Sequence, residues 1–273
     1  MKTADLHIHT TASDGAFSVS EVLEEARKLG LSAIAITDHD SVEALPRASA
    51  LAPRYGIELI PGIEISVELE DSEVHLLGYC IDYEDPAFQK RLSDFRKARK
   101  ERVEKMVKKL NELGLPLDMD ELLPGQMTGA VGRLHVALAL YRAGHVKTVP
   151  EAFRKYIGLK GPAYLPKSKI SPKEAMDMIL RLGGVPVLAH PGSLNRDEII
   201  PELVSLGLAG LEVYYPSHNQ RQVNHYLELA RFHDLLVTGG SDCHGPNKGK
   251  ILMGSVRIPY DLVERLKEKA GHC

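Results

Sequence analysis

The chain has 273 residues, of which 44% are hydrophobic and 26% are charged, and its formal net charge is −3. These values are typical of a folded protein with a large core, and they exclude both a disordered chain and wholesale wrapping of nucleic acid by positive charge. Three cysteines without a CxxC pair predict neither a disulfide framework nor a zinc ribbon. The N-terminus lacks the apolar core of a signal peptide, and no window approaches about 18 uninterrupted apolar residues. We therefore expect a cytoplasmic protein.

The first informative stretch is the motif DLHIHT near the N-terminus. Leu6 and Ile8 alternate with His7 and His9, so an extended strand would place both imidazoles on one face and both aliphatic groups on the other. Asp14 follows in a turn that contains glycine. Two imidazoles and a carboxylate at a strand end could hold a divalent cation; the alternative is a half-buried strand with polar histidines.

A helix is predicted over residues 20–30, with Ser20 as its N-cap and an apolar stripe at helical spacing. The apolar run that follows predicts a parallel strand covered on both faces, and it ends in Thr37-Asp38-His39-Asp40. A solvated turn is one interpretation of this ending. Because nothing structural requires three ionisable groups in a row, we favour a functional site.

A second helix is predicted over residues 42–55, followed by a strand over residues 57–69. Glu64 lies in this strand between aliphatic neighbours and must point away from them. A buried glutamate is costly unless it is paired or bound to a metal ion. The next apolar run, residues 74–79, contains His75, which could also be a hydrogen-bonded core imidazole.

The composition of the sequence changes after residue 85. Residues 90–109 contain ten Lys or Arg and three acidic residues at helical periodicity. They form either a solvated helix face or a basic rim that attracts phosphorylated substrates. We interpret residues 90–168 as a helical insertion that forms a substrate cap, and residues 1–89 with 169–273 as the barrel domain.

Alternating strands and helices return after the insertion, beginning with a helix opened by Ser171 and Pro172. Three further strands end in polar residues, at His190, near His218, and at the Asp242-Cys243-His244 sequence. Strand alternation should turn the Cys243 sulfur away from its two polar neighbours.

Nine residues of metal-ligand type therefore lie at, or just past, the predicted carboxyl ends of successive strands, which converge on one face of a parallel barrel. Mixed imidazole and carboxylate ligands suit Zn, Mn or Fe, and clustered metals about 3.5–4 Å apart favour phosphate ester hydrolysis, with amide hydrolysis as the chemical alternative. The nine are His7, His9, Asp14, His39, Glu64, His75, His190, Asp242 and His244.

Taken together, the motifs DLHIHTTASDG, ITDHD, GIEIS, HLLGY, AHPG and GSDCH resemble the PHP (polymerase and histidinol phosphatase) family in order and spacing. The resemblance spans nearly the whole chain. It implies an α/β fold, a distorted (β/α)7 TIM-like barrel, with a site that commonly holds three metal ions. GRLHVALAL, HVKTVPEAF, PAYLPK and LEVYYPSH look closest to a branch that acts on nucleoside 3′,5′-bisphosphates or trims short RNAs from the 5′ end.

The resemblance also implies three ligand sets. The first is His7, His9, Glu64 and Asp242, the second is Glu64, His75 and His190 with Glu64 shared, and the third is Asp14, His39 and His244. Every position holds a competent ligand. We expect two to three divalent ions, with Mn as the first candidate and Zn or Fe as alternatives.

Four further residues are candidates for substrate or catalytic roles. Arg133 and His135 in GRLH are predicted to contact phosphate or substrate, because guanidinium offers paired donors to phosphate oxygens. The alternative is a surface arginine beside a helix-packing histidine. His218 could bind phosphate or protonate the leaving group. Asp40 could act as a general acid or base, or could orient a ligand imidazole from outside the metal shell, as could Asp38.

We therefore expect a metal-dependent phosphoesterase that uses a hydroxide bridging two metals to hydrolyse a nucleoside 3′,5′-bisphosphate, a short oligoribonucleotide, or both. Its partner is a small phosphorylated nucleotide or short RNA, with no membrane and no stable protein partner implied. A histidinol-phosphate phosphatase and a non-catalytic, metal-stabilised module are the alternatives. Leu134, where many relatives of this branch have proline, leaves the local loop shape open.

Overall fold

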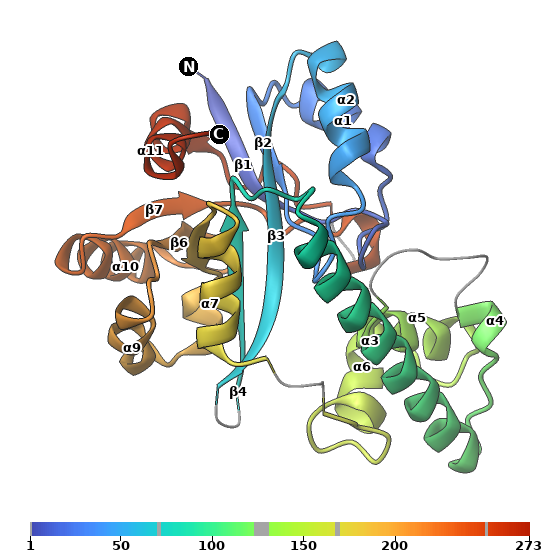
Figure 1. The fold of residues 1–273 in the computed structure, drawn as a ribbon. Coiled ribbons are helices and arrows are strands. Elements are labelled where there is room, and N and C mark those ends of the chain that lie inside the picture. Colours follow the sequence, from blue (N-terminus) through green and yellow to red (C-terminus); the bar gives the residue numbers. More distant parts are fainter. Residues whose placement is uncertain (1, 70–71, 123–130, 167–169, 249–250) are drawn as a thin grey trace.

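Eight strands run side by side in the order β7-β6-β5-β4-β3-β2-β1-β8 in the computed structural model (Figure 1). The structure describes residues 2–69, 72–122, 131–166, 170–248 and 251–273. The strands are β1 (Thr3–Ile8), β2 (Ala33–Ile36), β3 (Glu58–Leu69), β4 (Ser72–Tyr79), β5 (Val185–Leu188), β6 (Gly210–Tyr214), β7 (Leu236–Gly239) and the short β8 (Ile258–Pro259).

The first seven strands follow one another in chain order around a barrel. The segment after β7 meets β1 again, because His9 N–H donates to the Cys243 carbonyl at 3.0 Å and Cys243 N–H donates to the His7 carbonyl at 3.3 Å. A parallel bridge between Ile8 and Cys243 thus completes the ring. The predicted distorted seven-stranded barrel is confirmed.

One strand runs against the predicted parallel order. β4 pairs antiparallel with both β3 and β5, whereas β1, β2 and β3 are mutually parallel, as are β5, β6 and β7. Only two residues separate β3 from β4 in the sequence, and a parallel pair would need a crossover of a dozen or more residues. The short connection therefore forces the antiparallel direction.

The predicted alternation in β1 holds for the histidines, since His7 and His9 both face Glu64, but it is wrong for the aliphatic residues. Leu6 packs with one hydrophobic cluster and Ile8 with another, although both were expected on one face. The pairing of β1 with β2 shifts register between Asp5 and Ile8. Such an irregularity re-aims side chains locally, and here it places His7 toward the site while Leu6 stays in the barrel interior.

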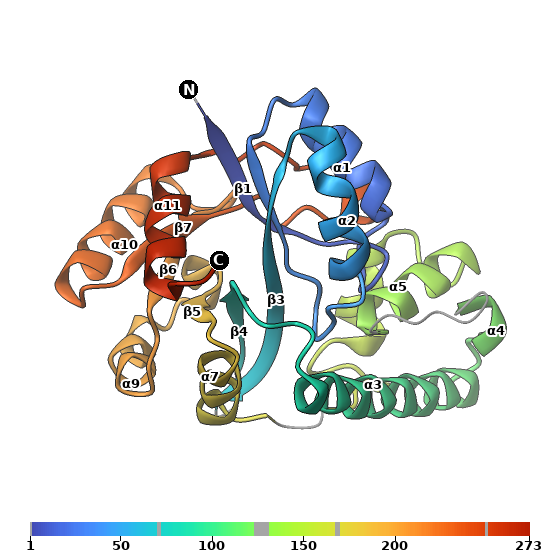
Figure 2. The same cartoon turned by 45° about the horizontal axis from the view of Figure 1, so that its top comes forward.

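Helices cover the outside of the barrel (Figure 2). They are α1 (Val19–Lys28), α2 (Leu45–Tyr55), α7 (Pro172–Arg181), α9 (Ile200–Ser205), α10 (Gln220–Phe232) and α11 (Tyr260–Ala270). Ser171 caps α7 as predicted, whereas α1 is capped by Ser18 and not by Ser20. Ser18 forms a capping box with Glu21, which satisfies two backbone donors at the helix start.

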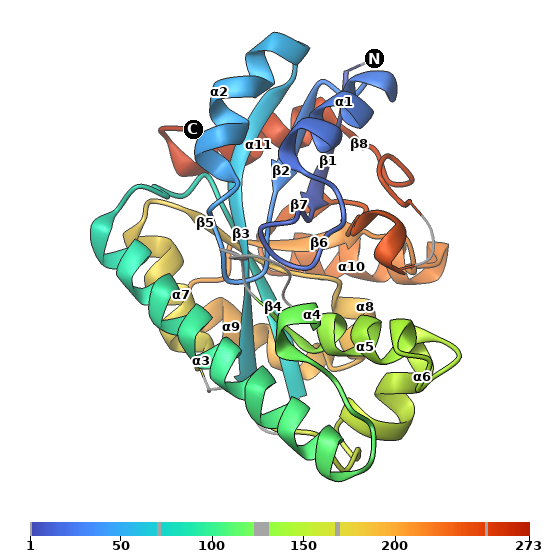
Figure 3. The same ribbon diagram turned by 90° about the vertical axis from the view of Figure 1, so that its right-hand side faces the viewer.

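A second group of helices projects from the side of the barrel (Figure 3). It comprises α3 (Pro86–Glu112), α4 (Met119–Leu122), α5 (Arg133–Arg142), α6 (Val149–Ala152) and the π-helical turn η1 (Phe153–Ile157). These helices enclose a hydrophobic cluster of their own, with Met106, Leu110 and Leu140 fully buried in it. α3 begins at Pro86, and residues 167–169, where the insertion was expected to end, lie outside the described residues.

Two further features concern the chain as a whole. In the described part of the chain, no helix combines the length and apolar character needed to cross a membrane. Cys80 and Cys273 form a disulfide, with their Cα atoms 5.3 Å apart, and Cys243 is a buried free thiol. Spacing alone did not reveal this pair, because its cysteines are 193 residues apart in the sequence.

The disulfide should contribute measurably to stability. Closing so long a loop restricts the unfolded chain and is worth on the order of 2–5 kcal/mol, or roughly 5–15 °C in Tm for a chain of this size. We expect thermal unfolding, followed by circular dichroism, to occur at a correspondingly lower temperature in dithiothreitol. Cys273→Ser should unfold at the temperature of the reduced protein, and dithiothreitol should not change its Tm. A wild-type Tm that dithiothreitol leaves unchanged would contradict the stabilising role.

Candidate metal centre

The structure brings all nine predicted ligand residues together at one end of the barrel. They come from β1 and the loop after it (His7, His9, Asp14), the segment after β2 (His39), β3 (Glu64), β4 (His75) and the segments after β5 (His190) and β7 (Asp242, His244). The elements that carry them pack side by side, which explains why residues far apart in sequence meet.

Two of the nine residues do not lie where the sequence analysis placed them. Glu64 lies in the middle of β3, which continues beyond its pairing with β2, and His75 lies near the beginning of β4. The antiparallel direction of β4 brings its amino end to the edge where the parallel strands have their carboxyl ends. His75 therefore lies at the site although its strand runs in the opposite direction to its neighbours.

Glu64 is the central carboxylate of the cluster. Its side chain is 1% exposed, and both of its oxygens face imidazole nitrogens. Oε2 lies 3.4 Å from His7 Nε2, 3.2 Å from His9 Nε2 and 3.0 Å from His39 Nδ1, while Oε1 lies 2.8 Å from His75 Nδ1 and 3.2 Å from His190 Nε2. One carboxylate thus bridges ligand-type groups from five positions.

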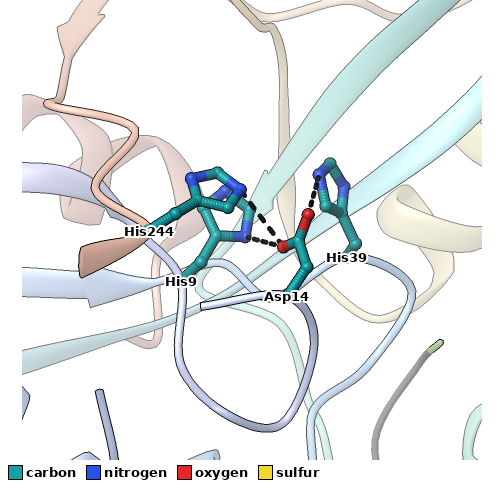
Figure 4. Close-up of side chains that lie close together, drawn as sticks. All are labelled: His9, Asp14, His39 and His244. Carbon is teal, nitrogen blue, oxygen red and sulfur yellow. Dashed lines mark ion pairs between the residues drawn. The ribbon is translucent and has the colours of Figure 1, made fainter. Parts of the chain in front are cut away.

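Asp14 forms the centre of a second group (Figure 4). Its Oδ1 lies 3.1 Å from His244 Nε2 and 3.8 Å from His9 Nδ1, and its Oδ2 lies 4.0 Å from His39 Nε2. The loop that carries Asp14 is tightly folded: a Cβ at Gly15 would lie 2.5 Å from the His9 carbonyl oxygen. Glycine is required there for close backbone approach.

Asp242 completes the arrangement from the segment after β7. Its Oδ1 lies 3.1 Å from His9 Nε2, 3.6 Å from His7 Nε2 and 3.3 Å from His244 Nδ1. Its other oxygen, Oδ2, accepts a hydrogen bond of 2.9 Å from Tyr215 Oη. Cys243 beside it packs in the hydrophobic cluster outside the barrel, away from the carboxylates.

The donor atoms fit divalent ions. Three groups have ligand atoms within 4.8 Å of one another: His9/Asp14/His39/His244, His7/His9/Asp242 and His39/Glu64/His75. Among the described residues, several buried ligand atoms have no hydrogen bond, including both ring nitrogens of His9, Nδ1 of His39 and Oε2 of Glu64. Buried polar atoms are normally satisfied, so unsatisfied lone pairs converging on common points are the arrangement a metal site requires.

Electrostatics within the cluster favour charged carboxylates. Burial would raise the pKa of Glu64, but His39, His75 and His7 outweigh it and hold the pKa well below its ordinary value. Burial would likewise raise the pKa of Asp14, but His244 and His39 outweigh it and hold this pKa well below its ordinary value. Burial lowers the pKa of His39, which keeps this imidazole neutral with one nitrogen available as a ligand. Glu64 and Asp242 instead raise the pKa values of His7 and His9, so a bound cation would have to displace a proton from these two rings.

The backbone is left-handed at three site positions. Asp40, His190 and Asp242 have φ angles of 48°, 32° and 50°, although none of them is glycine. Such conformations cost of order 1–3 kcal/mol and persist where the surroundings impose them, typically at functional sites. A Cβ at Gly240 would lie 2.4 Å from the backbone nitrogen of His7, so the strand carrying Asp242 packs directly against the strand carrying His7.

His135 on α5 lies against the loop that carries Asp14. Its Nδ1 accepts a hydrogen bond of 3.2 Å from Gly132 N–H, and its ring also hydrogen-bonds the backbone of Ser13. Burial lowers its pKa, and nearby Asp14 only partly offsets that effect. The projecting helices therefore contact the loop that carries Asp14.

Arg133 lies beside His135 on α5 and packs on aromatic rings. Its guanidinium carbon lies 5.9 Å from the centre of the Phe153 ring and 5.7 Å from that of Tyr164. Arg102 approaches Tyr164 as well, at 6.0 Å. The two guanidinium groups are thus held by aromatic contacts, which restricts their freedom.

The side chain of Asp40 contacts Arg99 and the backbone of Ser66. Its Oδ2 accepts a hydrogen bond of 2.8 Å from Arg99 Nε and is also close to Arg99 Nη2, and its Oδ1 accepts one of 3.1 Å from Ser66 N–H. This ion pair links α3 to the barrel next to His39.

His218 lies at the edge of the cluster with both ring nitrogens engaged. Nδ1 lies 2.8 Å from the Val213 carbonyl oxygen, and Nε2 accepts a hydrogen bond of 3.1 Å from Gly192 N–H. Burial lowers the pKa of this imidazole. The ring holds the turn that follows His190 and does not present a free nitrogen to the centre in this geometry.

The sequence analysis missed three residues of the site. Glu212 on β6 is fully buried and hydrogen-bonded to His7, Tyr215 donates to Asp242, and Arg99 pairs with Asp40. Glu212 carried the same signal as Glu64, a glutamate between aliphatic residues in a strand. Arg99 could not be distinguished among the ten basic residues of its helix.

Fold and site together define a barrel protein of the PHP class, and the chain belongs to the PHP domain family, which residues 5–156 match. A 3′,5′-nucleoside bisphosphate phosphatase from Chromobacterium violaceum is 32% identical over 255 residues, which cover 91% of this chain and 90% of that protein. The 5′-3′ exoribonuclease Rnm from Salmonella typhimurium is 32% identical over 249 residues, covering 89% and 85%.

A crystal structure from Bifidobacterium adolescentis, of a protein classed as a metal-dependent phosphoesterase, matches with a TM-score of 0.90 and 34% identity, covering 97% of this chain and 96% of that one. These comparisons confirm the predicted family and the predicted enzyme class, a phosphate ester hydrolase that depends on divalent metal ions. They do not favour the histidinol-phosphate alternative.

Divalent ions should stabilise the folded protein. An ion that binds only the native state at about 100 times its Kd adds about 2.7 kcal/mol. We therefore expect MnCl2 to raise the Tm of chelator-treated protein in a thermal-shift assay, and His9→Ala to lose most of that response. His225→Ala is the matched control, because His225 pairs with Asp197 on the surface. A wild-type Tm that Mn, Zn and Fe all leave unchanged would contradict the metal site.

Proposed function

We propose that this phosphoesterase acts on nucleotides that carry a terminal phosphate: it converts nucleoside 3′,5′-bisphosphates to nucleoside 5′-monophosphates, trims short oligoribonucleotides from the 5′ end, or does both. The observation that carries the proposal is the convergence of unsatisfied imidazole and carboxylate atoms on shared points at the barrel mouth. The two relatives named above, a bisphosphate phosphatase and an exoribonuclease, support the substrate class.

The metal ligands are proposed as the three sets that the family resemblance implies. Two of the geometric groups correspond to parts of these sets, since His7, His9 and Asp242 meet in one group, and Glu64 and His75 meet in another. The third group contains Asp14, His39 and His244, with His9 beside them. We propose Mn as the resident metal, because mixed imidazole and carboxylate ligands without thiolate suit it. When bound, such ions activate water and neutralise the charge of the phosphoryl group.

The protein's own residues would hold and orient the substrate. We propose that residues 90–168 act as a substrate cap over the barrel domain, because His135 from this segment contacts the Asp14 loop and Arg99 contacts Asp40. Arg133, braced by Phe153 and Tyr164, would bind phosphate oxygens as a paired donor. His135 would line the same approach.

The other two candidates receive different roles. His218 is proposed to support the His190 turn, since both of its nitrogens are already engaged, and its catalytic role would require them to be released. Asp40 is proposed to orient the Arg99 guanidinium toward the substrate side of the site. A general acid or base role at Asp40 would compete with that ion pair.

Substrate class can be tested by phosphate release. We expect purified Mn-loaded protein to turn over adenosine 3′,5′-bisphosphate or a 5′-phosphorylated RNA trimer faster than histidinol phosphate, because the relatives act on nucleotides. With the trimer, released mononucleotides are measured by chromatography. His7→Ala should abolish turnover. Turnover of histidinol phosphate alone would refute the nucleotide proposal and leave the metal site intact.

Arg133 can be tested separately. Arg133→Ala should reduce kcat/KM for the preferred nucleotide by more than tenfold, about 1.4 kcal/mol or more of transition-state stabilisation, because a paired phosphate donor is lost. Arg142→Ala, at the exposed end of the same helix, is the control and should behave as wild type. Near wild-type kcat/KM in Arg133→Ala would exclude the phosphate-binding role.

A further inference from the structure

Glu212 is a buried carboxylate that lies behind the candidate ligands. Its exposed fraction is 0%, and it projects from β6 into the barrel, while its neighbours Leu211 and Val213 pack in the outer hydrophobic cluster. A carboxylate buried at this depth is costly unless strong hydrogen bonds satisfy it. In the described part of the chain, it is hydrogen-bonded by an imidazole and a backbone amide.

The two oxygens of Glu212 hold two different candidate ligands. Oε1 accepts a hydrogen bond of 2.9 Å from His7 Nδ1, and Oε2 accepts one of 2.8 Å from the backbone N–H of His190. The first bond fixes the proton of His7 on Nδ1. The other ring nitrogen, Nε2, then faces the cluster, where it lies 3.4 Å from Glu64 and 3.6 Å from Asp242 and could bind a metal ion.

The second bond acts on the backbone. His190 has a φ of 32°, a left-handed conformation that a histidine adopts only when its surroundings impose it. Glu212 anchors the amide of this residue, and the ring then extends to within 3.2 Å of Glu64 Oε1. The position of one oxygen thus determines where a second imidazole enters the site.

We propose that Glu212 is a positioning residue that couples two metal positions: it orients His7 in the first ligand set and His190 in the second through one rigid carboxylate. This inference rests on the metal sets of the proposed function. Tyr215 provides a contrast, because it holds Asp242 alone and hence acts on a single ligand set.

The chemistry of glutamate makes the proposal specific. Both partners are N–H donors, so both oxygens must be acceptors. In Glu212→Gln, one of the two positions becomes an NH2 group that faces another donor, and one hydrogen bond is lost. Glu212→Asp retains the charge and two acceptors but is shorter by one methylene group. The expected order of metal affinity is wild type, then Asp, then Gln.

The experiment measures metal binding without turnover. Apo wild type, Glu212→Gln, Glu212→Asp and Thr238→Val are titrated with Mn in competition with a chelating dye, and the Co-substituted proteins are compared by their visible absorption spectra. Thr238 is fully buried, and it pairs in register with Glu212 on the neighbouring strand. Its hydroxyl hydrogen-bonds the Leu211 carbonyl and Tyr79, so Thr238→Val controls for the loss of a buried polar group whose hydrogen bonds are not to a candidate ligand.

We expect Glu212→Gln to bind Mn roughly 10–100-fold more weakly at two positions and to change the Co spectrum, since supporting partners of metal ligands typically have effects of this size. Thr238→Val should lower Tm yet retain wild-type metal affinity and spectrum. If Glu212→Gln does not fold in the presence of chelator, the test uses Glu212→Asp instead. Its Mn affinity and Co spectrum are then compared with those of Thr238→Val.

The outcomes separate the two proposals. Wild-type protein that binds no Mn, Zn or Fe would overturn the proposed function itself. Wild type that binds Mn, beside a folded Glu212 variant with the same affinity and the same Co spectrum, would overturn the positioning role alone. Weakened binding at a single position would overturn the coupling, because both ligand sets must respond.

Discussion

The structure depends on the burial of one carboxylate, Glu64, among imidazoles from five positions. A glutamate that is 1% exposed would be strongly destabilising in an apolar strand. Here imidazole nitrogens lie within 3.4 Å of each of its two oxygens. Two features of the barrel make this arrangement possible. The long β3 carries Glu64 beyond its pairing with β2, and the antiparallel β4 brings His75 to within 2.8 Å of it.

A second layer of buried carboxylates holds the first. Asp38 accepts hydrogen bonds from Thr10 N–H at 2.7 Å, Thr10 Oγ1 at 2.6 Å and Ser13 Oγ at 2.5 Å, and so fixes the loop that carries Asp14. Asp5 accepts from Ser241 N–H at 2.8 Å, next to Asp242. Burial raises the pKa of Asp5 to about 6 against these hydrogen bonds. Together with Glu212, these residues impose the positions of the ligands before any ion arrives, which reduces the cost of organising the site.

Most residues of the candidate site could be predicted from the sequence, but fewer details of the fold that brings them together could be. The nine candidate ligand positions could be predicted because ionisable residues interrupt apolar strands at places where core packing gives them no purpose. The direction of β4 was also implicit in the two-residue link to β3, although the assumption of a parallel barrel obscured it. The packing of Leu6 and Ile8 in different hydrophobic clusters could not be predicted, since a register irregularity has no local sequence pattern. Likewise, the pairing of Cys80 with Cys273 and that of Asp40 with Arg99 depend on tertiary contacts alone.

The division between barrel and projecting helices bears on specificity. A cluster of cations recognises the phosphoryl group that all phosphate esters share, so it cannot by itself select one ester over another. Selection must come from groups that contact the rest of the substrate. The proposed cap would supply such groups at the mouth, where Arg99 pairs with Asp40 and His135 contacts the Asp14 loop. Most basic residues of α3 are exposed, whereas Arg99 and Arg102 turn inward to fixed partners. Under the proposed function, discrimination among phosphorylated substrates would rest on these braced guanidinium groups more than on the general charge of the helix, because only groups held in place can reject a substrate of the wrong shape.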